Sequence, residues 1–457
     1  MNTPRHICQV AFSALDNFGL RKWYCDAFQL LESSRILFFP PSTTQVQGIK
    51  NALSTCGWLV DSQDYFQLEF FKFINPRSKP RPDRKPSDIG YNILGIQVAD
   101  FDKTVKRLNA MGSAPITDPR GDKGNRRVCV ADPEGNIVEL FESYPVSFPD
   151  VVASRPEINS TVRSIVVSVP DLEKSRNYFS EVLGLSVVED GVLHDESHEE
   201  MWGLPGARSK RLLLRSANFL VELVQYIEPS PRAWPEGYQI CDQGIMNIAL
   251  GYSSTADFDQ AFKKAVDGGS RPNGKPVDIG VFKVMYVNDD DGFSVEMLHA
   301  RRRLWSVSGF NPSYAYVTNE VMIDASPEEV WSVLTDHDTM GDWCLFKAKV
   351  VRPGDTDPKG LGTQRKVSAL GMKILEEIIE WEPHRRFAYT VRSGGGVKDY
   401  RGDLLLSPQD DGTHLRWSMR FRPLIPGGGK PAALLLKKIF ASAVQQLKAK
   451  VEAAKAV

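Results

Sequence analysis

This 457-residue chain contains few cysteines, no long apolar run and almost no net charge. Its six cysteines are scattered with no CxxC pair, which argues against a disulfide framework and favours reduced thiols in a cytosol. No run of eighteen apolar residues occurs, and the amino terminus lacks the apolar centre of a signal peptide. We therefore expect a cytoplasmic protein that does not enter membranes.

Signatures of phosphate and nucleophile chemistry are also missing. No glycine-rich loop precedes a predicted helix, and no serine or cysteine occupies a nucleophile elbow. The 56 basic residues nearly balance the 57 acidic ones, so no global field attracts nucleic acid or an anionic membrane. A neutral or amphiphilic small molecule is the partner that this composition favours.

An internal repeat is the most informative feature present. Residues 99–115 recur as residues 256–272, and both runs begin with Ala-Asp-Phe-Asp. Each run leads to a similar closing strand, at residues 131–140 in the first copy and 288–297 in the second. A repeat of this length indicates a duplicated structural unit.

Within each copy, two halves show the same order of strand, helix and three strands. A third, different pattern follows, with a capping box at Ser326–Glu329 and a long amphipathic helix over 431–454. The sequence thus predicts an α+β protein with domains at residues 1–145, 158–303 and 314–457. We expect the lysines of the closing helix to face solvent while its apolar stripe docks on its own sheet.

The repeated halves resemble the vicinal oxygen chelate superfamily, which includes glyoxalases, bleomycin-resistance proteins and extradiol dioxygenases. The resemblance is carried by Val-Pro-Asp-Leu-Glu-Lys-Ser at 169–175, Asp-Pro-Glu-Gly-Asn at 132–136 and Met-Trp-Gly-Leu-Pro-Gly-Ala at 201–207. It covers about residues 5–300 and implies paired βαβββ modules that curl an eight-stranded sheet around a ligand cavity.

The tail resembles the START-like SRPBCC group, often labelled polyketide cyclase or dehydrase. The carrying features are Val330-Trp331 on the capped helix, Asp336-His337-Asp338 after it, Trp343, and the closing helix. This resemblance implies a helix-grip fold, in which a curved sheet surrounds an apolar pocket. Trp343, Tyr389 and Tyr400 are candidates for contact with a ligand there.

The first resemblance also implies positions for metal ligands, one on the first and one on the last strand of each half. Mapped on this chain, they are Gln9, Glu69, Asn92 and Glu139 in the first copy and Ser164, Glu222, Asn247 and Glu296 in the second. All late glutamates are present, and the family's histidines are absent. Carboxylate and amide oxygens suit Mg²⁺ or Mn²⁺ better than zinc or iron, and Gln9, Glu69 and Glu139 are the candidate metal ligands.

Two other interpretations of these glutamates remain open. They can line a polar floor and hydrogen-bond the Asn side chains, because buried carboxylates need partners. Alternatively, burial raises a glutamate pKa and makes it a general acid or base without a metal. His194 and His198, spaced like metal ligands on a helix, lie in a polar connection that we interpret as a solvated loop.

We predict an enzyme that transfers protons on a polyketide-like, steroid-like or aromatic compound, leading to cyclisation, isomerisation or elimination. Glu69 or Glu139 would be the base, and Gln9 and Asn92 would orient an oxyanion. The reaction would use no cofactor or a weakly held divalent metal. The alternative is a protein that sequesters such a compound. A third role treats the second copy, which has Ser164 at a ligand position, as a scaffold for a homodimer contact with a cavity filled by side chains.

Overall fold

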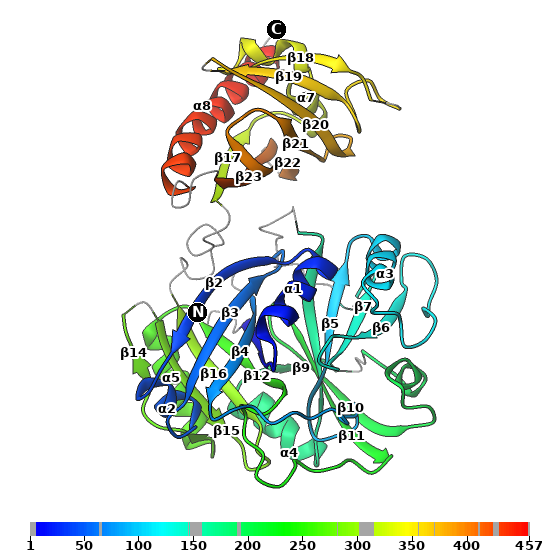
Figure 1. Cartoon of the computed structure of the whole chain (residues 1–457), viewed down its shortest axis with the longest axis vertical. Helices are drawn as coiled ribbons and strands as arrows, with labels where there is room; N and C mark the ends of the chain where they lie inside the picture. The colour runs from blue at the N-terminus through cyan, green and yellow to red at the C-terminus, as the bar shows by residue number, and fades with distance from the viewer. Residues whose placement is uncertain are drawn as a thin grey trace. The chain divides into compact units, whose positions relative to one another are not determined.

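The computed structural model describes residues 6–63, 66–144, 146, 158–189, 193–280, 282–300, 315–354, 356–369, 371–409, 412–423 and 429–455. The chain divides into two compact units, Met1–Gly309 and Phe310–Val457. Each unit has its own sheet (Figure 1). The domain limits expected at 145, 303 and 314 lie outside the described residues.

The first unit consists of four modules in chain order. Module 1 contains β1 (His6–Ser13), α1 (Asn17–Phe28), β2 (Leu31–Phe38), α2 (Ser42–Gln47), β3 (Leu53–Val60) and β4 (Gln67–Asn75). Module 2 contains β5 (Gly90–Val98), α3 (Phe101–Ala110), β6 (Arg127–Ala131) and β7 (Ile137–Phe141).

Modules 3 and 4 follow the same order. Module 3 contains β8 (Ser160–Ser168), α4 (Leu172–Asn177), a π-helical turn η1 (Tyr178–Val182), β9 (Ser186–Val187), a 3₁₀ helix η2 (Glu196–Trp202), β10 (Arg208–Arg215) and β11 (Leu220–Glu228). Module 4 contains β12 (Gly244–Tyr252), α5 (Thr255–Asp267), β13 (Arg271–Pro272), β14 (Val277–Asp278), β15 (Phe282–Asn288) and β16 (Ser294–Ala300).

Polar caps start the main helix of each module, as the sequence pattern predicts. Asp16, Asp100, Asp171 and Ser254 each accept a hydrogen bond from the backbone amide three residues later. Such a cap satisfies one of the amides that a helix leaves unpaired at its start. These helices and their strands give the duplicated βαβββ pattern.

The modules pair across the two sequence copies rather than within them. Strand β1 of module 1 runs antiparallel to β12 of module 4, and β5 of module 2 runs antiparallel to β8 of module 3. Figure 1 shows the blue strands β2, β3 and β4 in one sheet with the green β12 and β16. Modules 1 and 4 therefore form one half of the first unit, and modules 2 and 3 form the other; we call each of these halves a half-barrel. The pairing of Ile245 with Tyr91 links the two half-barrels.

The second unit is a seven-stranded antiparallel sheet in the order β17-β23-β22-β21-β20-β19-β18. Its strands are β17 (Ala315–Ile323), β18 (Lys347–Arg352), β19 (Gln364–Ala369), β20 (Met372–Glu382), β21 (Arg386–Ser393), β22 (Val397–Gln409) and β23 (Gly412–Pro423). Helix α7 (Pro327–Leu334), the 3₁₀ helix η4 (His337–Asp342) and the long helix α8 (Gly429–Lys455) complete it.

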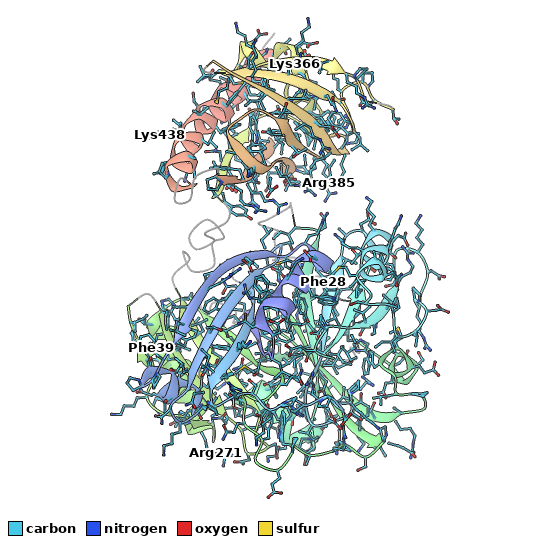
Figure 2. The ribbon with its side chains drawn as sticks, in the orientation of Figure 1. Phe28, Phe39, Arg271, Lys366, Arg385 and Lys438 are labelled. Atoms are coloured by element: carbon cyan, nitrogen blue, oxygen red, sulfur yellow. The ribbon has the colours of Figure 1, made fainter. Side chains whose placement is uncertain are left out.

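The closing helix packs on this sheet as expected. Phe440, Val444, Leu447 and Val451 of α8 belong to the buried core of the second unit. Lys438 is exposed and points away from the sheet (Figure 2). The capping box at Ser326 is confirmed, because its side chain and that of Glu329 exchange hydrogen bonds with each other's backbone amides.

No helix in the described parts of the chain is both long enough and apolar enough to span a membrane.

Candidate active site

The candidate residues of the first unit fall into two sites, one in each half-barrel. The first acidic site contains Gln9 and Glu69 from module 1 with Asn247 and Glu296 from module 4. The second acidic site contains Glu139 from module 2 and Glu222 from module 3. The expectation that Gln9, Glu69, Asn92 and Glu139 act together is wrong, because β1 pairs with β12 and not with β5.

Strand register places the first acidic site on one face of its sheet. Ala11 lies opposite both Glu69 and Asn247, and Gln9 lies opposite Ala249, which in turn lies opposite Glu296. Residues in register, and residues two apart along a strand, share a face of the sheet. The four polar side chains therefore share one face, although they come from opposite ends of the first unit's sequence.

Buried polar atoms without partners mark this site. Glu69 and Glu296 each have a buried Oε2 atom with no hydrogen-bond partner, as do the Gln9 Oε1 atom and both side-chain amide atoms of Asn247. The Glu69 Oε1 atom lies 3.5 Å from the weak donor Cys56 Sγ, and the Trp58 side chain also interacts with this carboxylate. Because buried polar groups normally find partners, this concentration makes the four residues a candidate binding site.

Both carboxyl groups of this site have pKa values above the usual range of glutamate. Burial raises the pKa of Glu69 to about 8. Burial, and then the charge of Glu69, raises the pKa of Glu296 well above its usual range. Among the described residues, no ion pair joins either carboxylate to a basic side chain. Ionising both carboxyl groups would place two negative charges in one buried site, which costs free energy. We therefore expect the pair to retain a proton near neutral pH.

The same atoms can be tested against the divalent metal that the family resemblance implies. Two carboxylates and two amide oxygens are hard ligands of the kind Mg²⁺ and Mn²⁺ accept. The unpartnered oxygens of Glu69, Glu296, Gln9 and Asn247 fit such an ion. Among the described residues, however, no three His, Cys, Asp or Glu side chains form a metal-binding cluster, so an ion here would depend on the amides.

The second acidic site is occupied by a side chain of the protein. His194 lies between the two glutamates, with Nε2 2.7 Å from Glu139 Oε2 and Nδ1 2.6 Å from Glu222 Oε2. All three side chains are at most 1 % exposed. Burial acts to lower the pKa of His194, but the two carboxylates outweigh it and raise that pKa to about 9.

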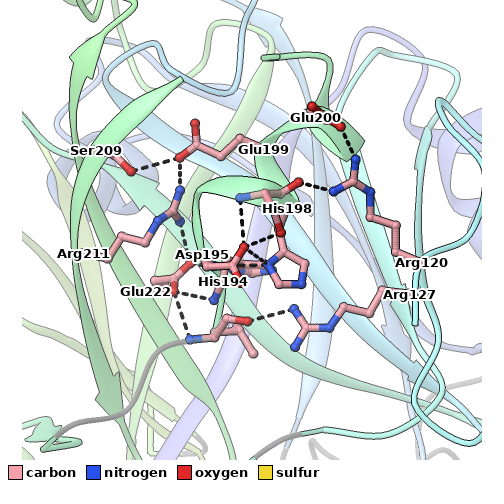
Figure 3. A network of polar contacts seen from close by, with 12 residues as sticks. Arg120, Arg127, His194, Asp195, His198, Glu199, Glu200, Ser209, Arg211 and Glu222 are labelled. Atoms are coloured by element: carbon pink, nitrogen blue, oxygen red, sulfur yellow. Dashed lines mark hydrogen bonds and ion pairs between the residues drawn. The ribbon is translucent and has the colours of Figure 1, made fainter. Parts of the chain in front are cut away.

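Arginine residues extend this site into a network of alternating charges (Figure 3). Arg211 pairs with Glu222 at 3.2 Å and also with Glu199, and Arg127 lies 3.8 Å from Glu139. Burial acts to raise the pKa of Glu222, but His194 and Arg211 outweigh it and hold that pKa below its usual range. Unlike the first acidic site, the second therefore pairs each carboxylate with a cation.

Three predictions about the second site are corrected by this geometry. His194 is buried and not in a solvated loop, because its partners come from two modules that fold around it. Glu139 does not fit a metal ligand, because the imidazole holds the position next to it. Asn92 donates to the backbone oxygens of Pro86 and Asp88, and Ser164 hydrogen-bonds the Tyr144 hydroxyl, so neither completes a ligand set.

His198, the second residue of the same pair, has a different place. It lies 2.9 Å from Asp195 and helps to cap η2. The role of His194 depends on its contacts with Glu139 and Glu222. Those contacts form only when modules 2 and 3 pair, so no sequence motif predicts them.

The tail candidates lie in the interior of the second unit. Trp343, Tyr389 and Tyr400 are all buried, and the hydroxyl groups of the two tyrosines are 3.2 Å apart. The Trp343 indole nitrogen has no partner. Arg365 lies 5.0 Å from the centre of the Tyr389 ring and forms a buried ion pair with Glu376. The aromatic candidates thus belong to a core that also contains polar groups.

The architecture defines two tandem glyoxalase-type repeats followed by a helix-grip domain. Residues 20–140 and 161–297 match the family described as Glyoxalase/Bleomycin resistance protein/Dioxygenase superfamily. Residues 314–452 match the family described as polyketide cyclase / dehydrase and lipid transport. The chain therefore belongs to the glyoxalase/bleomycin resistance/dioxygenase superfamily, with a polyketide cyclase-type domain after the repeats.

Individual relatives are distant. An uncharacterised protein of Mycobacterium tuberculosis is 28% identical over 135 residues, which is 28% of this chain and 77% of that protein. A glyoxalase I variant from Zea mays is 15% identical and covers 65% of this chain and 94% of its own, with a TM-score of 0.45. A putative dioxygenase from Bacillus subtilis is 14% identical, covering 66% and 86%, also with a TM-score of 0.45.

Proposed function

We propose that the protein is an enzyme that transfers protons on a hydrophobic carbonyl compound of polyketide, steroid or aromatic type. Its active site is the first acidic site, and the outcome is cyclisation, isomerisation or elimination. The observation that carries this proposal is the pairing of Glu69 with Glu296 in a buried site whose polar atoms lack partners. Paired carboxyl groups of this kind can supply an acid and a base at the same pH.

The chemistry assigns separate roles to the two carboxyl groups. The ionised carboxylate of the pair takes a proton from the carbon next to the substrate carbonyl, leaving an enolate. The protonated carboxyl returns a proton at a second position, or to a departing hydroxyl group, and the pair ends with the same number of protons. The Asn247 amide nitrogen, which lies beside the Tyr286 side chain, donates to the enolate oxygen, where negative charge develops in the transition state.

A divalent ion is the second way in which these residues can act. Glu69, Glu296 and the amide oxygens of Gln9 and Asn247 would hold it, and it would polarise the substrate carbonyl as a Lewis acid. Glu69 and Glu296 are required in either case.

The surroundings of the first acidic site support a hydrophobic substrate. Trp58 lies opposite Glu69 in the register of β3 and β4, and Phe38 packs edge-on against Trp58 at 6.1 Å. Val46 and Tyr286 belong to an apolar cluster that includes Ala249, next to Glu296 in register. We assign the apolar body of a second ligand, or of the product, to the helix-grip domain around Trp343, Tyr389 and Tyr400.

Deuterium exchange tests the proposal directly. Purified protein is incubated in D₂O with a panel of polyketones, steroid enones and aromatic ketones, and loss of C–H signals is followed by NMR. We expect many exchange events per chain with at least one compound, and their loss in Glu69→Gln.

Sequestration is the competing function, because the family's histidine ligands are absent and His194 fills the second acidic site. It predicts retention of at most one compound per site, with no exchange above the rate without protein. Equilibrium dialysis of the same panel measures that retention.

A further inference from the structure

Modules 1 and 3 each have a connection at the equivalent place in the βαβββ pattern, and the two connections bring different residues to the two acidic sites. In module 1, the connection from β2 to β3 contains α2 and brings the uncharged Val46 and Gln47 to the sheet. In module 3, the corresponding connection from β9 to β10 contains η2 and brings His194 between Glu139 and Glu222.

The contacts of His194 determine its charge. A neutral imidazole has one donor nitrogen and one acceptor nitrogen, whereas an ionised carboxylate only accepts hydrogen bonds. Both ring nitrogens of His194 lie within 2.7 Å of a carboxylate oxygen. Both contacts are satisfied together when both nitrogens carry protons, which makes the ring an imidazolium cation.

Charge balance across the network agrees with a cation at this position. The buried acidic groups are Glu139, Glu222 and Glu199, and the arginines beside them are Arg127 and Arg211. Three carboxylates and two guanidinium groups leave one negative charge, and the imidazolium neutralises it. The other titratable neighbours are His198, which faces Asp195, and Cys129, Tyr144 and Tyr226. Burial raises the pKa of each of these last three, so they add no charge.

The segment that carries His194 is fixed at several points. The backbone amides of Leu193 and His194 both donate to Glu222 Oε1, at 3.1 and 3.0 Å. Arg127 donates to the Leu193 carbonyl at 2.8 Å, and the Trp202 ring packs edge-on against the imidazole with centres 4.8 Å apart. Figure 3 shows His194 in one network with Arg127, Glu222 and Arg211. The ring is therefore held in place from both modules.

We propose that the second acidic site is a cation site permanently occupied by the protein's own imidazolium, His194, which stands where an external cation or ligand would bind. This half-barrel then binds no metal ion, and any ion-binding or ligand-binding function of the repeats is confined to the first acidic site. The proposal concerns the second site alone and holds whether or not the first site is catalytic.

Nitrogen NMR of the intact chain labelled with ¹⁵N-histidine reads the charge without any substitution of the network. Of the seven histidines, we expect one whose two ring nitrogens are both protonated at about pH 8, where an ordinary histidine is neutral. That signal disappears in His194→Asn and persists in His198→Asn, the matched control from the same segment. A neutral ring at His194 overturns the proposal.

Mn²⁺ binding provides the second measurement, by electron paramagnetic resonance on the full chain. We expect wild-type protein to bind at most one equivalent, and Glu139→Gln and Glu222→Gln to leave that binding unchanged. His194→Gly vacates the position, and we expect it to gain one equivalent of Mn²⁺ or to recover thermal stability when imidazole is added. Mn²⁺ bound by wild-type protein and lost in Glu222→Gln overturns the proposal even if His194→Gly does not fold.

The two proposals fail separately. Absence of turnover or exchange with every compound contradicts the proposed enzyme and leaves the charge of His194 unaffected. A neutral His194 contradicts the occupied-site proposal and leaves the exchange experiment unaffected.

Discussion

Glu69 on β4 and Glu296 on β16 belong to one buried site, and the charge of Glu69 raises the pKa of Glu296. The two residues come from the first and the last module of the duplicated unit. Their meeting follows from the antiparallel pairing of β1 with β12, which joins the outer modules. The inner modules then pair with each other and form the second acidic site, where the carboxylates have cationic partners.

Substitution at the two sites should therefore have opposite effects on activity and stability. We expect Glu69→Gln and Glu296→Gln to lower the rate of proton exchange by roughly 10²–10⁴-fold, the usual contribution of a general acid or base. Thermal stability should change little or increase, because each substitution removes one of two buried carboxyl groups that have no cationic partner. Exchange assays and thermal unfolding of the two variants check both parts.

Glu139→Gln and Glu222→Gln are the matched controls. They remove one partner of a buried ion pair, so we expect lower stability by about 3–5 kcal/mol and an exchange rate per folded chain close to that of the wild type. A large loss of exchange in these two variants, together with full activity in Glu69→Gln, would show that the active site is the second acidic site and not the first.

The stability of the first unit should decrease as the pH rises. Burial raises the pKa of Glu69 to about 8, whereas an unfolded chain has an ordinary glutamate pKa near 4.5. Between these values the folded chain holds a proton that the unfolded chain has released, so the free energy of unfolding falls with increasing pH. His194, with its pKa raised from 6.5 to about 9, acts in the same direction between those values.

Glu69→Gln separates the two contributions, because it removes the titrating carboxyl group and keeps the His194 network. Urea unfolding at several pH values from about 5 to 9 should give a shallower decline for this variant than for the wild type. Equal slopes would show that Glu69 ionises normally in the folded protein.

Cutting the chain between the sequence copies should prevent folding of either copy alone. A fragment of residues 1–145 contains β1 and β5 without β12 and β8, so two long strand edges in the middle of the half-barrels lose their partners. We expect each of the fragments 1–145 and 158–303 to aggregate or to dimerise when expressed alone, and the two together to form a folded complex. Size-exclusion chromatography with circular dichroism distinguishes these results from a stable monomeric fragment 1–145.

The sequence was sufficient for the repeated modules, the capped helices and the burial of the four late-strand glutamates, because each depends on local periodicity or on a short motif. It was not sufficient for the pairing of the modules. Strands β1 and β5 have similar apolar patterns, and so do β8 and β12, so pairing within copies and pairing between copies satisfy the same pattern. The burial of His194 does not follow from the sequence for the same reason: its polar neighbours predict an exposed loop, and the carboxylates that bury it come from β7 and β11.

The helix-grip domain contains a buried ion pair whose removal should be costly. Arg365 Nε and Nη2 both lie 2.9 Å from Glu376 Oε2, and Arg365 also contacts His337 Nδ1 at 2.9 Å. Burial, together with the charge of Arg365, lowers the pKa of His337 to about 3, so this ring is neutral and its Nδ1 accepts the hydrogen bond. Arg365→Met leaves the Glu376 carboxyl buried without a partner, and we expect a loss of about 3–5 kcal/mol in the free energy of unfolding.

The double variant Arg365→Met/Glu376→Leu should recover much of that loss, because it removes the unpaired carboxyl group together with its former partner. Tryptophan fluorescence during urea unfolding includes this domain through the buried Trp343 and Trp417, and the part of the transition that shifts only in the Arg365 and Glu376 variants identifies it among the nine tryptophans of the chain. If the single and double variants are equally unstable, the ion pair contributes through packing of the Arg365 side chain on the Tyr389 ring rather than through its charge.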